Sequence, residues 1–316
     1  MIDAFAHLYP PAYMQRLQAL PVRLPIFVHA APSHTDANFR IGELDRYEIE
    51  MQAIALGTPS YDELYTQEQI AQAAELTCIG NDGIAEAVAH YPHRLIGVAT
   101  LPLVDSENIE PAMEELERAV KQLQFKAVQL YTRVGDKGLD DARFAPLLER
   151  IVEYDIPILL HPTGGADNPL AREYMLWLTF GWPFETSLVM LRLVYSGVME
   201  KFPQLKILTH HIGAFIPLMA ERIKGVTFTL DKAEGTQQVG SVLPILKRFY
   251  GDTAVNGYMP ALRAGYEFFG GEHVLFGTDY PFVPIAPQRE SIVNWELPEQ
   301  DKLNIMDANA RKLFKI

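Results

Sequence analysis

The stretch "KAVQLYTRVGDKGLDDARFAPLLERIVEYDIPILLHP", residues 126–162, joins two apolar runs through an amphipathic segment. The runs at 126–131 and 157–162 are predicted to be strands, whereas residues 140–155 carry apolar side chains at three- and four-residue spacing, which is typical of a helix. Parallel strands need a crossover connection of this kind. The stretch therefore predicts a parallel sheet with helices packed on it.

The same alternation continues along the whole chain. Helical patterns recur at residues 67–76, 110–123 and 185–202, between further apolar runs. No low-complexity tract, charge block or linker rich in Pro, Gly and Ser divides the 316 residues, so we expect one domain, residues 1–316. Eight such units predict an α/β fold, a closed (β/α)8 TIM barrel. The predicted strands are residues 2–7, 51–56, 95–100, 126–131, 157–162, 206–211, 248–253 and 273–279.

Two connections are too long to be simple loops between a strand and its helix. They are residues 8–45, after the first strand, and residues 162–183, after the fifth. Because both follow strands, we expect these long loops to cover the mouth of the barrel, at the carboxyl ends of the strands.

Composition excludes several kinds of partner. A net charge of −13 repels nucleic-acid phosphates and anionic lipid surfaces, so neither nucleic acid nor membrane is expected. The single Cys78 excludes an intrachain disulfide framework, and no run approaches the roughly 18 apolar residues that a membrane span needs. The amino terminus shows no basic segment followed by a long apolar stretch. We therefore expect a soluble, cytoplasmic protein.

Polar residues fall at the ends of four predicted strands. They are His7, His161, the pair His210 and His211, and Asp279. TIM barrels build their active sites at this face, from residues on several strands. A single such residue has an ordinary structural explanation, since it can bond a loop backbone or cap a helix. Four together favour a catalytic metal site, because imidazole and carboxylate groups bind divalent zinc, iron or manganese.

Four stretches of the chain together carry a family resemblance. They are "IDAFAHLYPP" (2–11), "LDDARFAPLLERIVEYDIPILLHP" (139–162), "GWPFETSLVMLRLVYSGVMEKFPQLKILTHHIGAFIP" (181–217) and "VLFGTDYPF" (274–282). These stretches resemble the amidohydrolase-related decarboxylase family. That family includes aminocarboxymuconate-semialdehyde decarboxylase and the resorcylate and carboxyvanillate decarboxylases. The resemblance implies the amidohydrolase type of TIM barrel, one divalent metal, usually zinc or manganese, and non-oxidative loss of carbon dioxide from a small aromatic or unsaturated acid.

The resemblance implies roles for the residues that match the family's motifs. Metal ligands would be His7, His161 and Asp279, and Asp279 would also carry a proton. His210 matches the family's histidine on the sixth strand, so His210 and Asp279 are the expected catalytic residues. His211 falls where most members of the family have glycine, and we expect it to contact the substrate.

The first strand departs from the family's His-x-His pattern. Phe5 stands at the first position, and its side chain has no atom that binds a cation. Alternation along the strand predicts that Asp3, Phe5 and His7 share one face. Two interpretations stay open. Either three protein ligands hold the metal and a water or the substrate completes its shell, or metal binding is weak or absent and Phe5 forms an apolar wall of the pocket.

Other residues are candidates for substrate binding. Arg133 follows the fourth strand and could hold a carboxylate through two hydrogen bonds, although a solvated loop arginine is equally consistent with its position. Trp177 and Trp182, with Phe184, could line an aromatic wall for a planar substrate or pack the loop onto the barrel. Weaker candidates in the first long loop are Arg23 and His29.

The sequence leaves three hypotheses for function. The first is a metal-dependent decarboxylase, a carboxy-lyase that acts on a small carboxylic acid. The second is a metal-dependent hydrolase or hydratase on the same scaffold, and the third is a metal-free degenerate barrel that binds a ligand. Family members are commonly dimers, and the apolar stretch at residues 180–199 could form a homodimer interface or a core helix.

Overall fold

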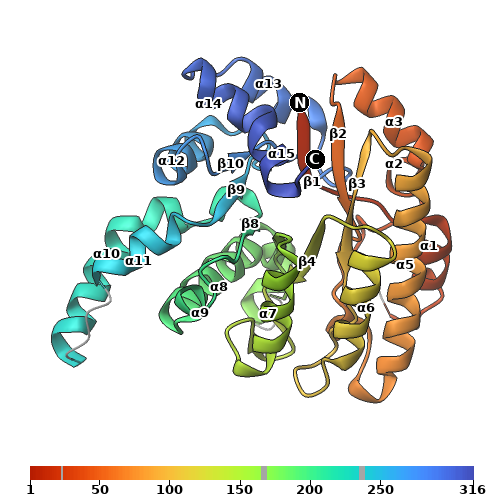
Figure 1. The fold of residues 1–316 in the computed structure, drawn as a ribbon, viewed down its shortest axis with the longest axis horizontal. Helices are drawn as coiled ribbons and strands as arrows, with labels where there is room; N and C mark the ends of the chain where they lie inside the picture. Colours follow the sequence, from red (N-terminus) through yellow and green to blue (C-terminus); the bar gives the residue numbers. More distant parts are fainter. Residues whose placement is uncertain (23, 165–168, 235–238) are drawn as a thin grey trace.

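Eight parallel strands form one sheet in the computed structural model (Figure 1). The structure describes residues 1–22, 24–164, 169–234 and 239–316. All eight predicted strands are present, and several are shorter than predicted. In spatial order they are β1 (Ile2–His7), β2 (Met51–Ala55), β3 (Leu95–Thr100), β4 (Ala127–Tyr131), β7 (Ile158–His161), β8 (Ile207–Thr209), β9 (Tyr250–Asp252) and β10 (Val274–Leu275), and a separate hairpin consists of β5 (Arg133–Val134) and β6 (Lys137–Gly138).

Backbone hydrogen bonds between β1 and residues 276–280 close the sheet into a barrel. The amide of Ala4 donates to the carbonyl of Phe276 at 2.8 Å, and the amide of Asp279 donates to the carbonyl of Phe5 at 3.0 Å. The amide of His7 donates to the carbonyl of Tyr280 at 2.8 Å. The predicted (β/α)8 barrel is therefore confirmed.

Helices surround the barrel (Figure 1). The described residues contain no helix that is both long and apolar enough to cross a membrane. The helices are α1 (Pro11–Gln18), α2 (Pro32–Thr35), α3 (Ala37–Arg46), α4 (Tyr61–Leu64), α5 (Ile70–His90), α6 (Glu110–Lys121), α7 (Ala145–Tyr154), α8 (Trp182–Tyr195), α9 (Val198–Lys201), α10 (Ile216–Glu234), α11 (Val239–Leu246), α12 (Met259–Phe269), α13 (Ile285–Val293), α14 (Glu299–Leu303) and α15 (Asn309–Phe314).

Helix α5 is longer than its predicted segment. The prediction ends at residue 76, whereas the helix continues to His90 through two glycines. A Cβ on Gly80 would lie 2.4 Å from the side chain of Leu56, and a Cβ on Gly83 would lie 2.3 Å from that of Pro10. These glycines therefore allow the helix to pack closely against Leu56 and Pro10. In a sequence alone, glycine disfavours a helix, so the prediction ended too early.

The two long connections carry short helices. The connection after β1 contains α1, α2 and α3, and the side chain of Asp36 caps α3 by accepting hydrogen bonds from the amides of Asn38 and Phe39. The described part of the connection after β7 forms short turns, η3 (Pro169–Ala171), η4 (Glu173–Met175) and the π-helical η5 (Trp177–Gly181). Phe27 of the first connection contacts Trp177 of the second, with ring centroids 6.3 Å apart.

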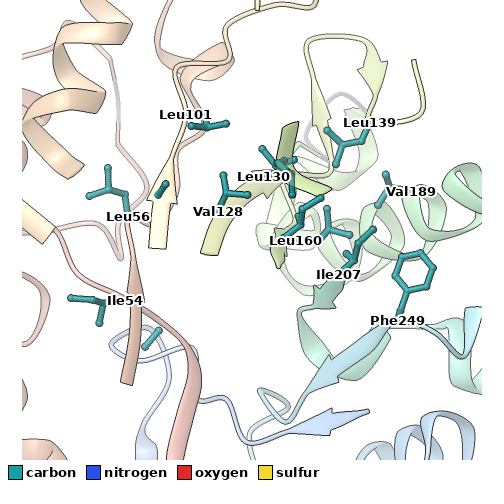
Figure 2. Packing of buried hydrophobic residues seen from close by; sticks show 14 of the residues in the cluster. Ile54, Leu56, Leu101, Val128, Leu130, Leu139, Leu160, Val189, Ile207 and Phe249 are labelled. Carbon is teal, nitrogen blue, oxygen red and sulfur yellow. The ribbon is translucent and has the colours of Figure 1, made fainter. Parts of the chain in front are cut away.

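Side chains of the strands alternate between two buried clusters. One cluster lies between the strands and the helices and includes Val128, Leu130 and Leu160 together with Val189 of α8 (Figure 2). The other cluster fills the barrel interior and includes the intervening residues, such as Ala127 and Leu159. This alternation is the one expected for strands buried on both faces.

A β-bulge interrupts the alternation of β1. Asp3 pairs with Gln52 and Ala6 pairs with Ile54, so two residues, Ala4 and Phe5, oppose a single residue of β2. Ala4 and Phe5 both join the interior cluster, whereas Ala6 joins the outer one. The prediction that Asp3 shares a face with Phe5 and His7 is therefore wrong, because the extra residue of a bulge inverts the alternation. Asp3 points toward the helices.

Candidate metal centre

Three histidines and one aspartate converge at the carboxyl ends of the strands. His7 is the last residue of β1 and His161 is the last residue of β7. His210 directly follows β8, and Asp279 lies beyond β10. The histidines are at most 1% exposed and Asp279 is 8% exposed. The structure thus brings together four of the five residues that were predicted from strand ends, and the fifth, His211, lies beside His210.

The distances within this group suit the shell of a single cation. The Nε2 atoms of His7 and His210 each lie 3.2 Å from Oδ1 of Asp279. Ligand nitrogens of His7, His161 and His210 lie within 4.8 Å of one another, and a second, overlapping group consists of His210, His211 and Asp279. Ligands bound at about 2.0–2.2 Å to one cation have neighbours at such spacings.

Several atoms of the group are buried without a hydrogen-bond partner among the described residues. They include Nε2 of His7, Nε2 of His210 and Oδ1 of Asp279, because their 3.2 Å contacts lack hydrogen-bond geometry. An unsatisfied buried polar atom costs about 1–3 kcal/mol. Nδ1 of His161 lies 2.6 Å from the carbonyl oxygen of Pro162, which leaves Nε2 free to bind a metal. These residues therefore fit a divalent cation.

Asp252 orients His210. It is fully buried at the end of β9, and its carboxylate accepts hydrogen bonds from Nδ1 of His210 and from the amides of His211, at 2.9 Å, and Ala254, at 3.0 Å. A carboxylate on Nδ1 fixes the ring of a histidine and directs its Nε2. Sequence reasoning missed Asp252, although this residue also ends a predicted strand.

Burial and charge give the histidines different protonation states. Burial lowers the pKa of His7 and lowers that of His161 well below the ordinary value. Burial also opposes a charge on His210, but the carboxylates of Asp252 and Asp279 raise the pKa of His210 to about 10. His7 and His161 are therefore neutral at pH 7, with lone pairs that can bind metal, whereas His210 holds a proton.

Asp279 and His211 respond to the charge on His210. Burial would raise the pKa of Asp279, but His210 and His7 hold it well below its usual range, so the carboxylate is ionised. Burial and the charge of His210 lower the pKa of His211 to about 4. The ring of His211 lies 4.4 Å from that of His210. At neutral pH the centre thus has a carboxylate next to a cationic imidazole.

Comparison with known proteins identifies the family. The Amidohydro_2 family, described as amidohydrolase, matches residues 2–316. The chain belongs to this amidohydrolase family. It is 30% identical over 301 residues to gamma-resorcylate decarboxylase of Polaromonas sp. strain JS666, and the alignment covers 88% of this chain and 86% of that relative.

Solved structures of the same fold agree with this amidohydrolase assignment. The 5-carboxyvanillate decarboxylase from Sphingomonas paucimobilis has a TM-score of 0.87 at 24% identity, with 100% of this chain and 99% of that chain covered. A dihydroxybenzoic acid decarboxylase from Polaromonas sp. JS666, with bound manganese and the inhibitor 2-nitroresorcinol, has a TM-score of 0.83 at 25% identity, with 99% and 96% covered. The amidohydrolase type of barrel and the resemblance to these decarboxylases are confirmed.

Phe5 lies inside the centre, among the rings of its three histidines. It is fully buried, and its ring stacks on the ring of His210 with centroids 4.1 Å apart and planes 26° apart. Its ring centroid lies 5.5 Å from that of His7 and 6.1 Å from that of His161. Phe5 therefore forms an apolar wall of the centre and covers one face of the His210 ring. The Nε2 edge of that ring points toward Asp279.

Phe5→His is expected to strengthen metal binding. The new imidazole would start from the same backbone position inside the centre and add a ligand to a preformed site. Phe5→Leu is the matched control, because it changes the size of the side chain without adding a ligand. The measurement is the metal retained after dialysis against a graded series of chelator concentrations. Equal retention by the two variants would show that the cation does not bind beside His7.

An aromatic group borders the centre. The ring of Trp182, which is mostly buried, meets the ring of His161 edge-on at 5.5 Å. Phe282 lies 5.4 Å from His7, again measured between ring centroids. Trp177 packs behind Trp182 at 5.4 Å, and Phe27 contacts Trp177, Trp182 and Phe282. Sequence reasoning missed Phe27 and Phe282, although Phe282 lies in the family-like stretch "GTDYPF".

Phe184 does not belong to this aromatic group. Its side chain is half-exposed in a surface groove that is also lined by Leu191 and Met219. The prediction that Phe184 lines the aromatic wall is therefore wrong, because Phe184 and Trp182 lie two positions apart on α8 and face different directions.

Arg133 lies on the β5–β6 hairpin, next to the segment that follows His161. Its Nε lies 4.0 Å from the carboxylate of Glu185. A Cβ on Gly164 would come within 2.1 Å of the guanidinium, so the glycine makes room for it. The role of Arg133 as a carboxylate clamp stays a prediction. His29 is exposed, with its ring 4.3 Å from that of His34, and Arg23 lies outside the described residues.

Proposed function

We propose that this member of the amidohydrolase family is a metal-dependent decarboxylase that removes carbon dioxide, without oxidation, from a small aromatic or unsaturated carboxylic acid. The observation that carries the proposal is the convergence of His7, His161, His210 and Asp279 with unpartnered ligand atoms. The relatives described above support the proposal, because they are decarboxylases of resorcylate, carboxyvanillate and dihydroxybenzoate.

His7, His161 and Asp279 are the proposed metal ligands. Two neutral imidazoles and a carboxylate favour zinc, and manganese is the second candidate because a Polaromonas neighbour holds it. When bound, the metal acts as a Lewis acid that stabilises the negative charge left by the departing carbon dioxide. Metal analysis of purified protein distinguishes the two ions.

His210 is the proposed proton donor. The bond between the substrate carbon and its carboxylate breaks, carbon dioxide leaves, and the electron pair stays on the carbon. The proton on Nε2 of His210 then forms the new C–H bond, and His210 becomes neutral. Asp252 keeps the imidazole oriented through Nδ1. Asp279, whose Oδ1 lies 3.2 Å from Nε2 of His210, is proposed to return a proton to His210 from solvent or to act as an alternative proton carrier.

The aromatic group is proposed to bind the substrate. Trp182 borders His161 and Phe282 borders His7, so a planar ring would pack between these two aromatic side chains. Burial of the centre keeps water away from the carbanion-like carbon, which strengthens the electrostatic contacts inside. Arg133 and His211 are proposed to contact polar groups of the substrate, and Trp177 supports Trp182 from behind.

Trp182→Ala is expected to raise KM by about 10-fold or more, which corresponds to the loss of roughly 1.4 kcal/mol of ring contact. Trp182→Phe keeps an aromatic face and should have a smaller effect. Phe184→Ala is the control, because Phe184 lies on the outer surface. The measurement is steady-state kinetics on the substrate found in the panel below. An unchanged KM in Trp182→Ala would remove this residue from the substrate site.

The proposed function is tested by carbon dioxide release from a panel of hydroxybenzoates and muconate semialdehydes. Protein is assayed as purified, after removal of metal by chelator, and after reloading with zinc or manganese. Release that disappears with the metal and returns on reloading supports the proposal. Turnover of esters or lactones without carbon dioxide would instead support a hydrolase, and ligand binding with no turnover at all would support a degenerate barrel.

We also propose a homodimer. Helices α10 and α11 extend away from the barrel (Figure 1), and apolar side chains stay exposed on α8 and α10. Exposed apolar patches of this kind mark interaction surfaces. Sedimentation velocity distinguishes a dimer from the 35.6 kDa monomer. The exposed apolar residues on these two helices include Phe184, Leu188, Leu218, Met219, Val226, Phe228 and Leu230.

A cytoplasmic location is the last part of the proposal. One cysteine in 316 residues is compatible with a reducing compartment. Fractionation of cells that express the chain tests it, and recovery with membranes or in the culture medium would contradict it.

A further inference from the structure

Four side chains form a fully buried chain of hydrogen bonds beside the metal centre. They are Arg40 of α3, Gln52 of β2, Asp3 of β1 and Thr278, each 0% exposed, and we call them the Asp3–Arg40 relay. Two of the four carry full charges, which are almost never completely buried unless they are paired. Here the charges are separated by the neutral amide of Gln52. None of the four residues takes part in the proposed chemistry.

The hydrogen bonds of the relay run without interruption from Arg40 of α3 to Thr278, which lies just beyond β10. Nη1 of Arg40 donates to Oε1 of Gln52 at 2.7 Å, and Nε2 of Gln52 donates to Oδ2 of Asp3 at 2.7 Å. The same Asp3 oxygen accepts a hydrogen bond from Oγ1 of Thr278 at 2.6 Å. Gln52 is therefore the central link, and both of its amide atoms are used.

At one end of the relay, Asp3 accepts hydrogen bonds from backbone amides where β1 pairs with residues 276–280. Oδ1 of Asp3 accepts the amide of Thr278 at 3.0 Å and the amide of Phe5, in the β1 bulge, at 3.3 Å. Thr278 directly precedes Asp279. Asp3 thus accepts hydrogen bonds from two backbone N–H groups at the place where the bulge interrupts regular pairing. These two bonds connect the bulge to Thr278, the residue before the proposed ligand Asp279.

The other end of the relay holds the backbone of His7. Nη2 of Arg40 donates to the carbonyl oxygen of His7 at 2.7 Å and to that of Ser33 at 2.9 Å. The guanidinium also lies 4.5 Å from the ring centroid of Tyr280, the residue after Asp279. The relay therefore bonds to the main chain of His7 itself and to the main chain of Thr278, the neighbour of Asp279.

We propose that the Asp3–Arg40 relay positions His7 and Asp279 for metal binding. The bulge turns Phe5 and His7 into the barrel, and the relay fixes the bulge against residues 278–280, so that Nε2 of His7 and Oδ1 of Asp279 stay 3.2 Å apart. Partners one step beyond the ligands commonly change metal affinity 10- to 100-fold when they are removed. The metal part of this inference rests on the proposed function, whereas the mechanical coupling of the two strand ends does not.

Gln52→Met tests the relay at its centre. Methionine has nearly the volume of glutamine but makes neither hydrogen bond, and Gln52 has no side-chain bond to His7 or Thr278. We expect about 10-fold or greater weakening of zinc affinity, measured by chelator competition. The control is Asn309→Leu, which removes two buried hydrogen bonds, to the carbonyls of Gly271 and Val274, away from the ligands. Both variants should lose thermal stability, but Asn309→Leu should bind zinc as the wild type does.

Equal zinc affinity in Gln52→Met and Asn309→Leu would overturn the inference and leave the relay a purely structural feature. Where Gln52→Met does not fold, Arg40→Lys takes its place, because one ammonium group cannot reach all the acceptors that the guanidinium bonds. The same weakening is expected for Arg40→Lys, and an unchanged affinity would overturn the inference equally.

Hydrogen exchange tests the coupling without any metal. In metal-free Gln52→Met, the amides of His7 and Thr278 should both exchange faster than in metal-free wild type. Faster exchange at one of them only, or at neither, would show that the relay does not couple the two strands. A wild type that binds no zinc or manganese would contradict the proposed function, and the exchange result would still decide on the coupling.

Discussion

Asp279→Asn is expected to lower turnover by about 10²- to 10⁴-fold, the usual range for loss of a group that takes part in proton transfer. Asp279 lies 3.2 Å from Nε2 of both His7 and His210 and supplies the negative charge of the centre. An amide of the same shape supplies neither the charge nor a place for a proton. The measurement is kcat for carbon dioxide release by protein loaded with excess metal.

A surface aspartate provides the control for Asp279→Asn. Asp155 precedes β7 and forms ion pairs with Lys206, which precedes β8, and with Lys315. The centre lies at the opposite, carboxyl ends of these strands, so Asp155→Asn should leave kcat unchanged. Circular dichroism should show an intact barrel in both variants. Near-normal turnover by Asp279→Asn would remove Asp279 from the catalytic machinery.

His161→Ala and His210→Ala should differ in whether they lose metal or lose turnover with the metal retained. His161 is proposed to bind the metal through Nε2, so its loss should lower the bound metal substantially. His210 is proposed to donate the proton, so His210→Ala should keep most of the metal but lose about 10²-fold or more in turnover. Metal analysis and kinetics on the same preparations provide the comparison.

Equal loss of metal in the two variants would show that His210 is a ligand. The nitrogens of His210, His7 and His161 are close enough for such a site. The proton donor would then have to be sought elsewhere in the centre. Asp252→Asn offers an independent check on His210, because it should weaken the orientation of the ring without removing any proposed ligand.

The barrel could be predicted because its signal is local. Each strand is a short apolar run, and each crossover has apolar residues at the spacing of a helix. The pattern can therefore be recognised within windows of about ten to twenty residues. His7, His161 and Asp279 were found for the same reason, since each lies at or just after the end of such a run. Asp252 also ends a strand, β9, so the same signal is present for this residue.

Other features of the site depend on contacts between distant segments. The bulge at Ala4 and Phe5 arises where β1 must pair with β2 on one side and with residues 276–280 on the other. Nothing within the first strand indicates that its alternation is broken. Phe27 and Phe282 likewise meet only because the long connection after β1 folds over the mouth of the barrel.

The junction that closes the barrel has a consequence for the order of events during synthesis. His7 is synthesised long before residues 276–280, the backbone segment that pairs with the other edge of β1. Contacts so far apart in sequence form slowly. Until they form, one edge of β1 is unpaired and is a place where aggregation can start. Metal uptake should therefore follow the synthesis of residues 276–280, and products truncated before these residues should be both metal-free and prone to aggregate.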